Sequence, residues 1–149
     1  MEEQNSADVI AVSTLIYRYF RCLDTHDAVG MVDCLVEDFE AFHTLIGNVK
    51  GRTNFMEVVM ATVPGLKITQ HYCMNQEITV HGDEALCLSY LYAQHVVSAD
   101  GDEDVLMPGG GRYRHECVRT AKGWKIMRLR IDVTWMDPRL ADVFRPDLT

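Results

Sequence analysis

The second half of the chain carries four long stretches in which the side chains alternate in character with a period of two. They span roughly residues 67–80, 84–98, 110–121 and 124–136, and this period is typical of β-strands. The connecting segments are His81-Gly82-Asp83, the acidic loop SADGDED running into PGGG, and Ala121-Lys122-Gly123. Because short connections join antiparallel neighbours, the pattern predicts long antiparallel strands in one sheet.

The first half of the chain has helical spacing instead. Apolar residues recur every three or four positions from Val9 to Leu23, behind Ser6, which can cap a helix. The pattern stops near Asp24. Helices followed by a run of long strands predict an α+β fold, with the helices packed on one face of a curved sheet.

Three shorter elements are expected between this helix and the long strands. Asp27 can cap a short second helix that extends to Val36. The segment FEAFHTLIGNVKG predicts a hairpin with Gly47-Asn48 as its turn. A third helix is expected to open at Thr53 and to end at Pro64-Gly65.

Length and charge restrict the partners that this chain is expected to have. Its 149 residues suit one domain spanning 1–149, in which residues 138–149 form a C-terminal tail or a lid. The net charge of −8 argues against nucleic acid or an anionic membrane as a partner, and no stretch is long enough to span a membrane. The basic residues that gather late in the chain are expected to form a solvated strand face.

Other sequence features point away from metals, nucleotides and secretion. The five cysteines are odd in number and form no C-x-x-C pair, which predicts reduced, mostly buried thiols in a cytoplasmic protein. MEEQNSAD has neither the basic nor the apolar region of a signal peptide. No nucleotide-binding motif occurs, and Gly109–Gly111 are expected to be a flexible loop. His26, His43, His81 and His115 lack the spacing that would gather a metal triad, so we expect no metal site.

Two of the predicted strands favour a ligand pocket. One face of residues 84–98 carries small side chains and ends in His95. Small residues on the concave side of a curved sheet leave space, and space lined by a few polar groups is how a ligand pocket is built. His71 lies on the polar face of residues 67–80, with Asn75 four residues on, so both histidines could point into this space. The alternative is that this polar face lies in water.

Asp24 occupies an unfavourable position, because the C-terminal end of a helix carries partial negative charge. A pocket histidine that acts as a general base needs an acceptor at its second ring nitrogen, and a carboxylate is suited to that task. We therefore predict that Asp24 pairs with a strand histidine. The alternative is that Asp24 only ends the helix and bonds local backbone.

The order of the elements, Asp24 near the end of the first helix, and TQHY around His71 resemble the SnoaL-like branch of the nuclear transport factor 2-like superfamily. The resemblance runs from about residue 8 to residue 137, and RTAKGWKIMRLRIDVTW is similar to the last hairpin of that family. It implies a cone-shaped, curved antiparallel sheet wrapped around the N-terminal helices.

Three enzyme groups of this superfamily share parts of the pattern. TQH at Thr69–His71, His95 and the D-x-x-W of Asp132–Trp135 resemble scytalone dehydratase. RYFRCLD at 18–24 resembles bile-acid 7-alpha-dehydratase and adds Tyr19, and hexachlorocyclohexane dehydrochlorinase shares the Asp and the His. Together they imply a cofactor-independent elimination, in which a histidine paired with aspartate removes a C–H proton while a neighbouring group leaves.

The resemblance also implies roles for particular side chains. His71 is the expected base and Asp24 its partner, while His95 and Tyr19 would bond the carbonyl or leaving hydroxyl of a cyclic or aromatic substrate. Asn75 is a further donor where charge develops. This sequence also departs from scytalone dehydratase. Phe42 falls near the place of a pocket tyrosine, and Arg112 and Arg114 fall where that enzyme has a pocket serine and asparagine. Independently of the resemblance, either arginine could hold a substrate carboxylate.

Two other functions remain open from the sequence. One is proton transfer without a leaving group, as in ketosteroid isomerase, and the other is a non-catalytic binding or accessory module, since fold does not fix function. The resemblance implies a homo-oligomer, with the trimer of the dehydratases favoured over the dimer of other branches.

Overall fold

The computed structural model describes residues 6–98 and 103–144. Its helices are α1 (Ser6–Asp24), α2 (Ala28–Cys34), α3 (Arg52–Thr62) and α4 (Leu140–Phe144), with a 3-10 turn at Val63–Gly65. Its strands are β1 (Leu35–His43), β2 (Gly47–Lys50), β3 (Ile68–His81), β4 (Glu84–Ser98), β5 (Asp104–Thr120) and β6 (Gly123–Met136).

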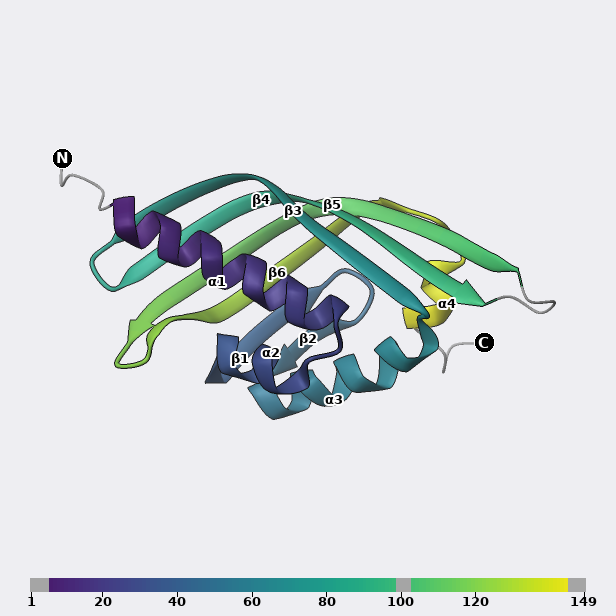
Figure 1. The fold of residues 1–149 in the computed structure, drawn as a ribbon, viewed down its shortest axis with the longest axis horizontal. Coiled ribbons are helices and arrows are strands. Elements are labelled where there is room, and N and C mark those ends of the chain that lie inside the picture. The colour runs from purple at the N-terminus through teal and green to yellow at the C-terminus, as the bar shows by residue number, and fades with distance from the viewer. Residues whose placement is uncertain (1–5, 99–102, 145–149) are drawn as a thin grey trace.

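The strands form one sheet in the order β2-β1-β6-β5-β4-β3. The sheet arches over α1, which crosses its concave face, while α2, α3 and the β1–β2 hairpin lie together at one side (Figure 1). This confirms the α+β architecture. The neighbours from β3 to β6 are antiparallel as expected, whereas β1 pairs with β6 in parallel.

The core lies between α1 and the concave face. The helix buries Val12, Ile16 and Tyr19, and the sheet buries Cys87 and Ile126 beneath them. Apolar residues at helical spacing therefore meet alternate residues of the strands, which is the arrangement that removes both stripes from water. All five cysteines are free and buried. None of the described helices is long and apolar enough to cross a membrane.

Two of the expected boundaries differ from the structure. Asp27 does cap α2, accepting a hydrogen bond from the Gly30 backbone N–H at 2.8 Å. That helix ends at Cys34, because Leu35 and the residues after it pair with β6 and alternate in burial as a strand. The hairpin turn lies at residues 44–46, just before Gly47.

Gly109–Gly111 are not a flexible loop, because they lie within β5. A Cβ atom on Gly110 would come within 2.5 Å of the Trp135 ring, and one on Gly111 would come within 2.0 Å of the Asp132 carbonyl oxygen. These glycines allow β6 to approach β5 closely, which is a packing role.

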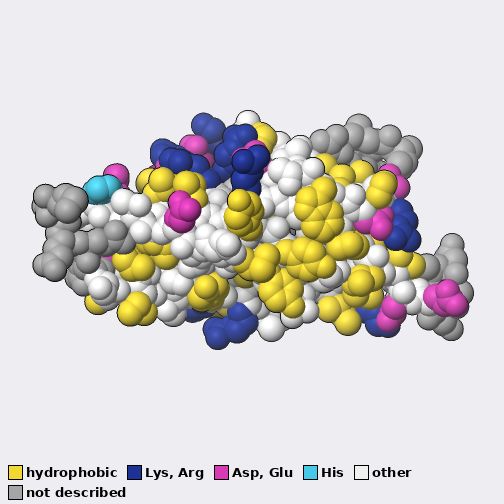
Figure 2. Space-filling view, turned by 90° about the horizontal axis from the view of Figure 1, so that it is seen from above, with side chains coloured by type: hydrophobic (Ala, Val, Ile, Leu, Met, Phe, Trp, Pro, Cys, Tyr) yellow, Lys and Arg dark blue, Asp and Glu magenta, His cyan; other side chains and the backbone are white. Residues whose placement is uncertain are grey.

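The outer, convex face of the sheet is divided between charge and apolar surface (Figure 2). Its arginines pair with nearby carboxylates: Glu116 lies 3.0 Å from Arg114 on the same strand and 3.0 Å from Arg128 on the neighbouring strand β6, which confirms a solvated strand face. Beside them is an outer patch of exposed large side chains, comprising Ile68, Tyr72, Met74, Leu88, Tyr90, Leu106 and Trp135.

Candidate active site

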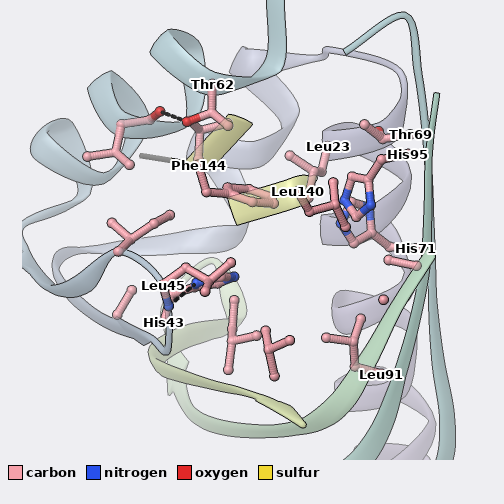
Figure 3. Close-up of a pocket in the computed structure, with 18 of the residues that line it drawn as sticks. Leu23, His43, Leu45, Thr62, Thr69, His71, Leu91, His95, Leu140 and Phe144 are labelled. Atoms are coloured by element: carbon pink, nitrogen blue, oxygen red, sulfur yellow. Dashed lines mark hydrogen bonds between the residues drawn. The ribbon is translucent and has the colours of Figure 1, made fainter. Parts of the chain in front are cut away.

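A cavity of about 120 Å³ lies between the concave face of the sheet and the helices (Figure 3). Most of its lining is aliphatic or aromatic. The polar side chains among the described lining residues are Tyr19, His43, Thr62, Thr69, His71, His95 and Tyr113. An apolar cavity with a few convergent polar groups is the usual form of a small-molecule site.

The predicted contact between Asp24 and His71 is present. Oδ1 of Asp24 lies 2.6 Å from Nδ1 of His71 and also accepts a hydrogen bond from the Thr69 hydroxyl at 2.9 Å. Its Oδ2 accepts the backbone N–H of His71 at 2.8 Å. β3 is an edge strand of the sheet, and this N–H points away from β4 toward α1. Three donors thus compensate a carboxylate that the end of a helix disfavours.

The electrostatics of this pair keep Asp24 ionised. Burial on its own would raise the pKa of the Asp24 carboxyl, but the hydrogen bonds and charge of His71, together with Thr69, hold it below its ordinary value of 3.8. A carboxylate can only accept, so Nδ1 of His71 carries a proton. No described residue bonds Nε2 of His71, which leaves its lone pair available in the neutral ring.

His95 lies beside His71, with the ring centroids 5.5 Å apart and the rings nearly perpendicular. Its Nδ1 is 3.2 Å from the Met107 carbonyl oxygen, so Nδ1 donates and the ring proton is on that atom. Burial, with the nearby charge of His71, lowers the pKa of His95 to about 4. His95 is therefore neutral at pH 7, and its Nε2 can only accept a hydrogen bond.

Two buried tyrosines line the same cavity. Tyr19 comes from α1, as the sequence suggested, and Tyr113 comes from β5. Burial raises the pKa of both phenols well above 10, so each keeps its proton and can donate. The sequence interpretation passed over Tyr113 because it assigned the neighbouring arginines to the cavity, whereas strand alternation admits only one of the two sets.

Besides Asp24, which lies behind His71, four of the predicted site residues do not line the cavity. Arg112 and Arg114 are exposed on the outer face, on either side of inward-facing Tyr113. Phe42 lies between Ala41 and His43, which line the cavity, and its own side chain does not. The Arg130 guanidinium lies over the Phe42 ring, 4.2 Å from its centroid. The fourth is Asn75.

Asn75 is exposed at an irregularity in β3, where the register with β4 shifts between Met74 and Glu77. It has a φ of 54°, which is in the left-handed region that asparagine tolerates better than most residues. The alternation predicted for this strand holds through Cys73, and beyond the irregularity Gln76 and Ile78 turn inward instead.

The hairpin and the C-terminal segment supply lining residues that the sequence interpretation did not name. His43 of β1 accepts the Leu45 backbone N–H at Nδ1 over 3.1 Å. The Phe144 ring lies 5.5 Å from the His43 ring and 5.9 Å from the His95 ring. Phe144 and Leu140 of α4 thus cover the end of the cavity where His43 and His95 lie. Both belong to the segment predicted as a tail or lid, of which residues 145–149 lie outside the described structure. Alternation along β1 could have indicated His43.

A second, shallower groove runs along the other side of the dyad, between α1 and the edge of β3. It is lined by Tyr17, Arg21 and Gln70, and by Asp24 and His71 themselves. The dyad therefore forms part of the wall between the cavity and the outside of the protein. Among the residues that the structure describes, no group of three histidine, cysteine or acidic side chains is arranged to hold a metal ion.

Comparison with known proteins gives a family and a fold. Residues 4–130 match the model of the SnoaL-like domain. The chain belongs to this family. No curated protein matches the chain in sequence.

Solved structures with the nuclear transport factor 2-like fold resemble this SnoaL-like protein over most of its length. Kfla4162 from Kribbella flavida is 18% identical, with a TM-score of 0.84 over 93% of this chain and 97% of that one. A candidate scytalone dehydratase from Novosphingobium aromaticivorans is 22% identical, with a TM-score of 0.81 over 91% and 90%. The hexachlorocyclohexane dehydrochlorinase LinA-type3 from Novosphingobium barchaimii is 20% identical, with a TM-score of 0.73 over 87% and 88%. At these identities the similarity shows the fold.

Proposed function

We propose that this SnoaL-like protein is a cofactor-independent, dehydratase-type lyase. The observation that carries the proposal is the Asp24–His71 contact in the wall of an apolar cavity, with Nε2 of His71 unbonded by described residues. Two structural neighbours support it, since one is a candidate scytalone dehydratase and another a dehydrochlorinase. The substrate would be a small cyclic or aromatic carbonyl compound that carries a leaving group.

In the proposed reaction, Nε2 of His71 takes a proton from the carbon next to the substrate carbonyl. The C–H electrons form the double bond of an enolate, and Asp24 stabilises the imidazolium that results. The enolate then expels the leaving group on the next carbon, which departs with its bonding electrons. If that group is hydroxide, the His71 imidazolium returns its proton and water is released. A positioned base of this kind contributes ~10²–10⁴-fold in rate.

Negative charge that develops on the carbonyl oxygen requires a donor nearby. Tyr19 and Tyr113 can supply it, because both line the cavity and burial keeps both phenols protonated. His95 is not suited to this role, because its Nδ1 proton is committed to the Met107 carbonyl.

The test is elimination by wild type and by dyad variants on a panel of small cyclic β-hydroxy ketones, with loss of water followed by mass spectrometry. We expect His71→Gln and Asp24→Asn to reduce kcat by ~10²–10⁴-fold. The matched control is Asp33→Asn, because Asp33 pairs with Arg18 and Lys125 outside the cavity. Full activity in both dyad variants would sink the proposal, and a product of unchanged mass would indicate isomerisation instead.

A further inference from the structure

The charge of the cavity restricts what it can bind. None of its described lining residues is Lys, Arg, Asp or Glu. Asp24 lies behind His71 and is hydrogen-bonded to Thr69 and His71. An ionised ligand would lose its hydration without gaining an opposite charge, which is costly in a largely apolar site. The cavity therefore favours uncharged ring compounds, and the expectation of a carboxylate held by arginine no longer has residues to support it.

His95 gives the cavity a hydrogen-bond acceptor and not a donor. His95 presents a lone pair at Nε2, since its Nδ1 proton is donated to the Met107 carbonyl at 3.2 Å. The ring is 5% exposed and no described residue bonds its Nε2. A ligand O–H can satisfy this nitrogen, whereas a carbonyl, ether or carboxylate oxygen would oppose it with a second lone pair.

We propose that His95 determines the specificity of this site by accepting a hydrogen bond from a hydroxyl group of an uncharged ring compound, a reading that rests on the function proposed above. The ring centroids of His71 and His95 are 5.5 Å apart. The selected hydroxyl therefore lies within a few bonds of the C–H that His71 attacks. Since Nε2 of His95 carries no proton, it cannot protonate a leaving hydroxide, and that proton comes from His71.

The experiment compares two uncharged probes that differ only in the donor, 4-ethylphenol and its methyl ether 4-ethylanisole. Their affinities for the full chain are measured by NMR titration. Wild type should prefer the phenol by about tenfold or more, since an unsatisfied buried acceptor is costly. His95→Phe should bind both probes with less than a twofold difference, while His71→Gln should keep the preference.

A preference that persists in His95→Phe, or that disappears only in His71→Gln, would overturn the proposal. If His95→Phe does not fold, wild type still provides a test, because ¹⁵N shifts of the His95 ring report which nitrogen is protonated. A proton on Nδ1 at pH 7 is expected, and one on Nε2 would contradict the inference.

Binding also separates this inference from the proposed reaction. Asp24→Asn should lose elimination and keep the preference for the phenol. A clear preference in wild type without elimination of any tested ketone would leave the role of His95 intact and refute the lyase. Elimination by wild type without a preference for the phenol would support the lyase and refute the role of His95.

Discussion

His115 is a buried residue whose chemistry the site does not use. It is fully inaccessible to solvent, it packs edge-on against Phe20 with ring centroids 5.7 Å apart, and neither of its ring nitrogens has a hydrogen-bond partner among the described residues. Burial lowers the pKa of His115 to about 3, against about 6.5 in an unfolded chain. Below pH 6.5 the unfolded state therefore binds a proton that the folded state does not, and stability falls until the pH reaches about 3. Between pH 6.5 and pH 5 this one histidine should cost about 2 kcal/mol of the free energy of unfolding. Urea denaturation at pH 7.5 and pH 5 should show His115→Leu losing less stability than wild type, with exposed His81→Gln as the matched control. An equal loss in wild type and His115→Leu would show that His115 does not set the acid response.

The four long strands could be predicted from the alternation of their side chains. Their irregularities could not, because these depend on packing that no local sequence pattern encodes. Residues 84–98 were predicted as a strand and are β4. The prediction succeeded because the two faces of this strand differ in burial, and the side chains alternate in character accordingly. The irregularity at Asn75 and the parallel pairing of β1 with β6 depend on partners far away in sequence, so neither was predicted. The same limit applies to the candidate site. Spacing and resemblance were enough to select Asp24, His71, His95 and Tyr19. To exclude Arg112, Arg114, Phe42 and Asn75, it was necessary to know which face of its strand each side chain occupies. Gly111 shows how strictly this packing is fixed. Gly111→Ala should lower the free energy of unfolding by ~1–3 kcal/mol, because the new Cβ meets a backbone oxygen that cannot move alone. Gly65→Ala is the control, since nothing lies within 4 Å of a Cβ there, and chemical denaturation should find it within ~1 kcal/mol of wild type. Similar stabilities for the two variants would show that β5 and β6 can separate at little cost.

At the scale of the whole molecule, the outer patch is the feature that the single chain leaves unexplained. Its large side chains are 40–56% exposed, and Tyr92 links Tyr72 to Trp135 across the sheet at 5.9 and 6.0 Å. The patch spans the four strands from β3 to β6. Contiguous apolar patches beyond a few hundred Å² mark interaction sites, and each partner buries ~800 Å² in a standard interface. Exposed Glu77 borders it on β3, and exposed Arg112 borders it toward β6. A two-fold axis along the strands would bring these opposite charges together, so we propose that the outer patch docks a second copy of this chain. Sedimentation should show a dimer for wild type and a monomer for Tyr90→Lys. Ile10→Lys, on an exposed position of α1, is the control and should stay dimeric, and a monomeric wild type would contradict the proposal.

The position of Asp24 beside the edge of the sheet has a consequence for aggregation. An edge strand presents unpaired N–H groups on which another chain can add a strand, and β3 is such an edge over 14 residues. At His71 this N–H is already occupied by Asp24. The carboxylate to which the proposed function gives a role beside His71 thus also occupies a backbone donor at the open margin of the sheet, where an incoming strand would otherwise bond.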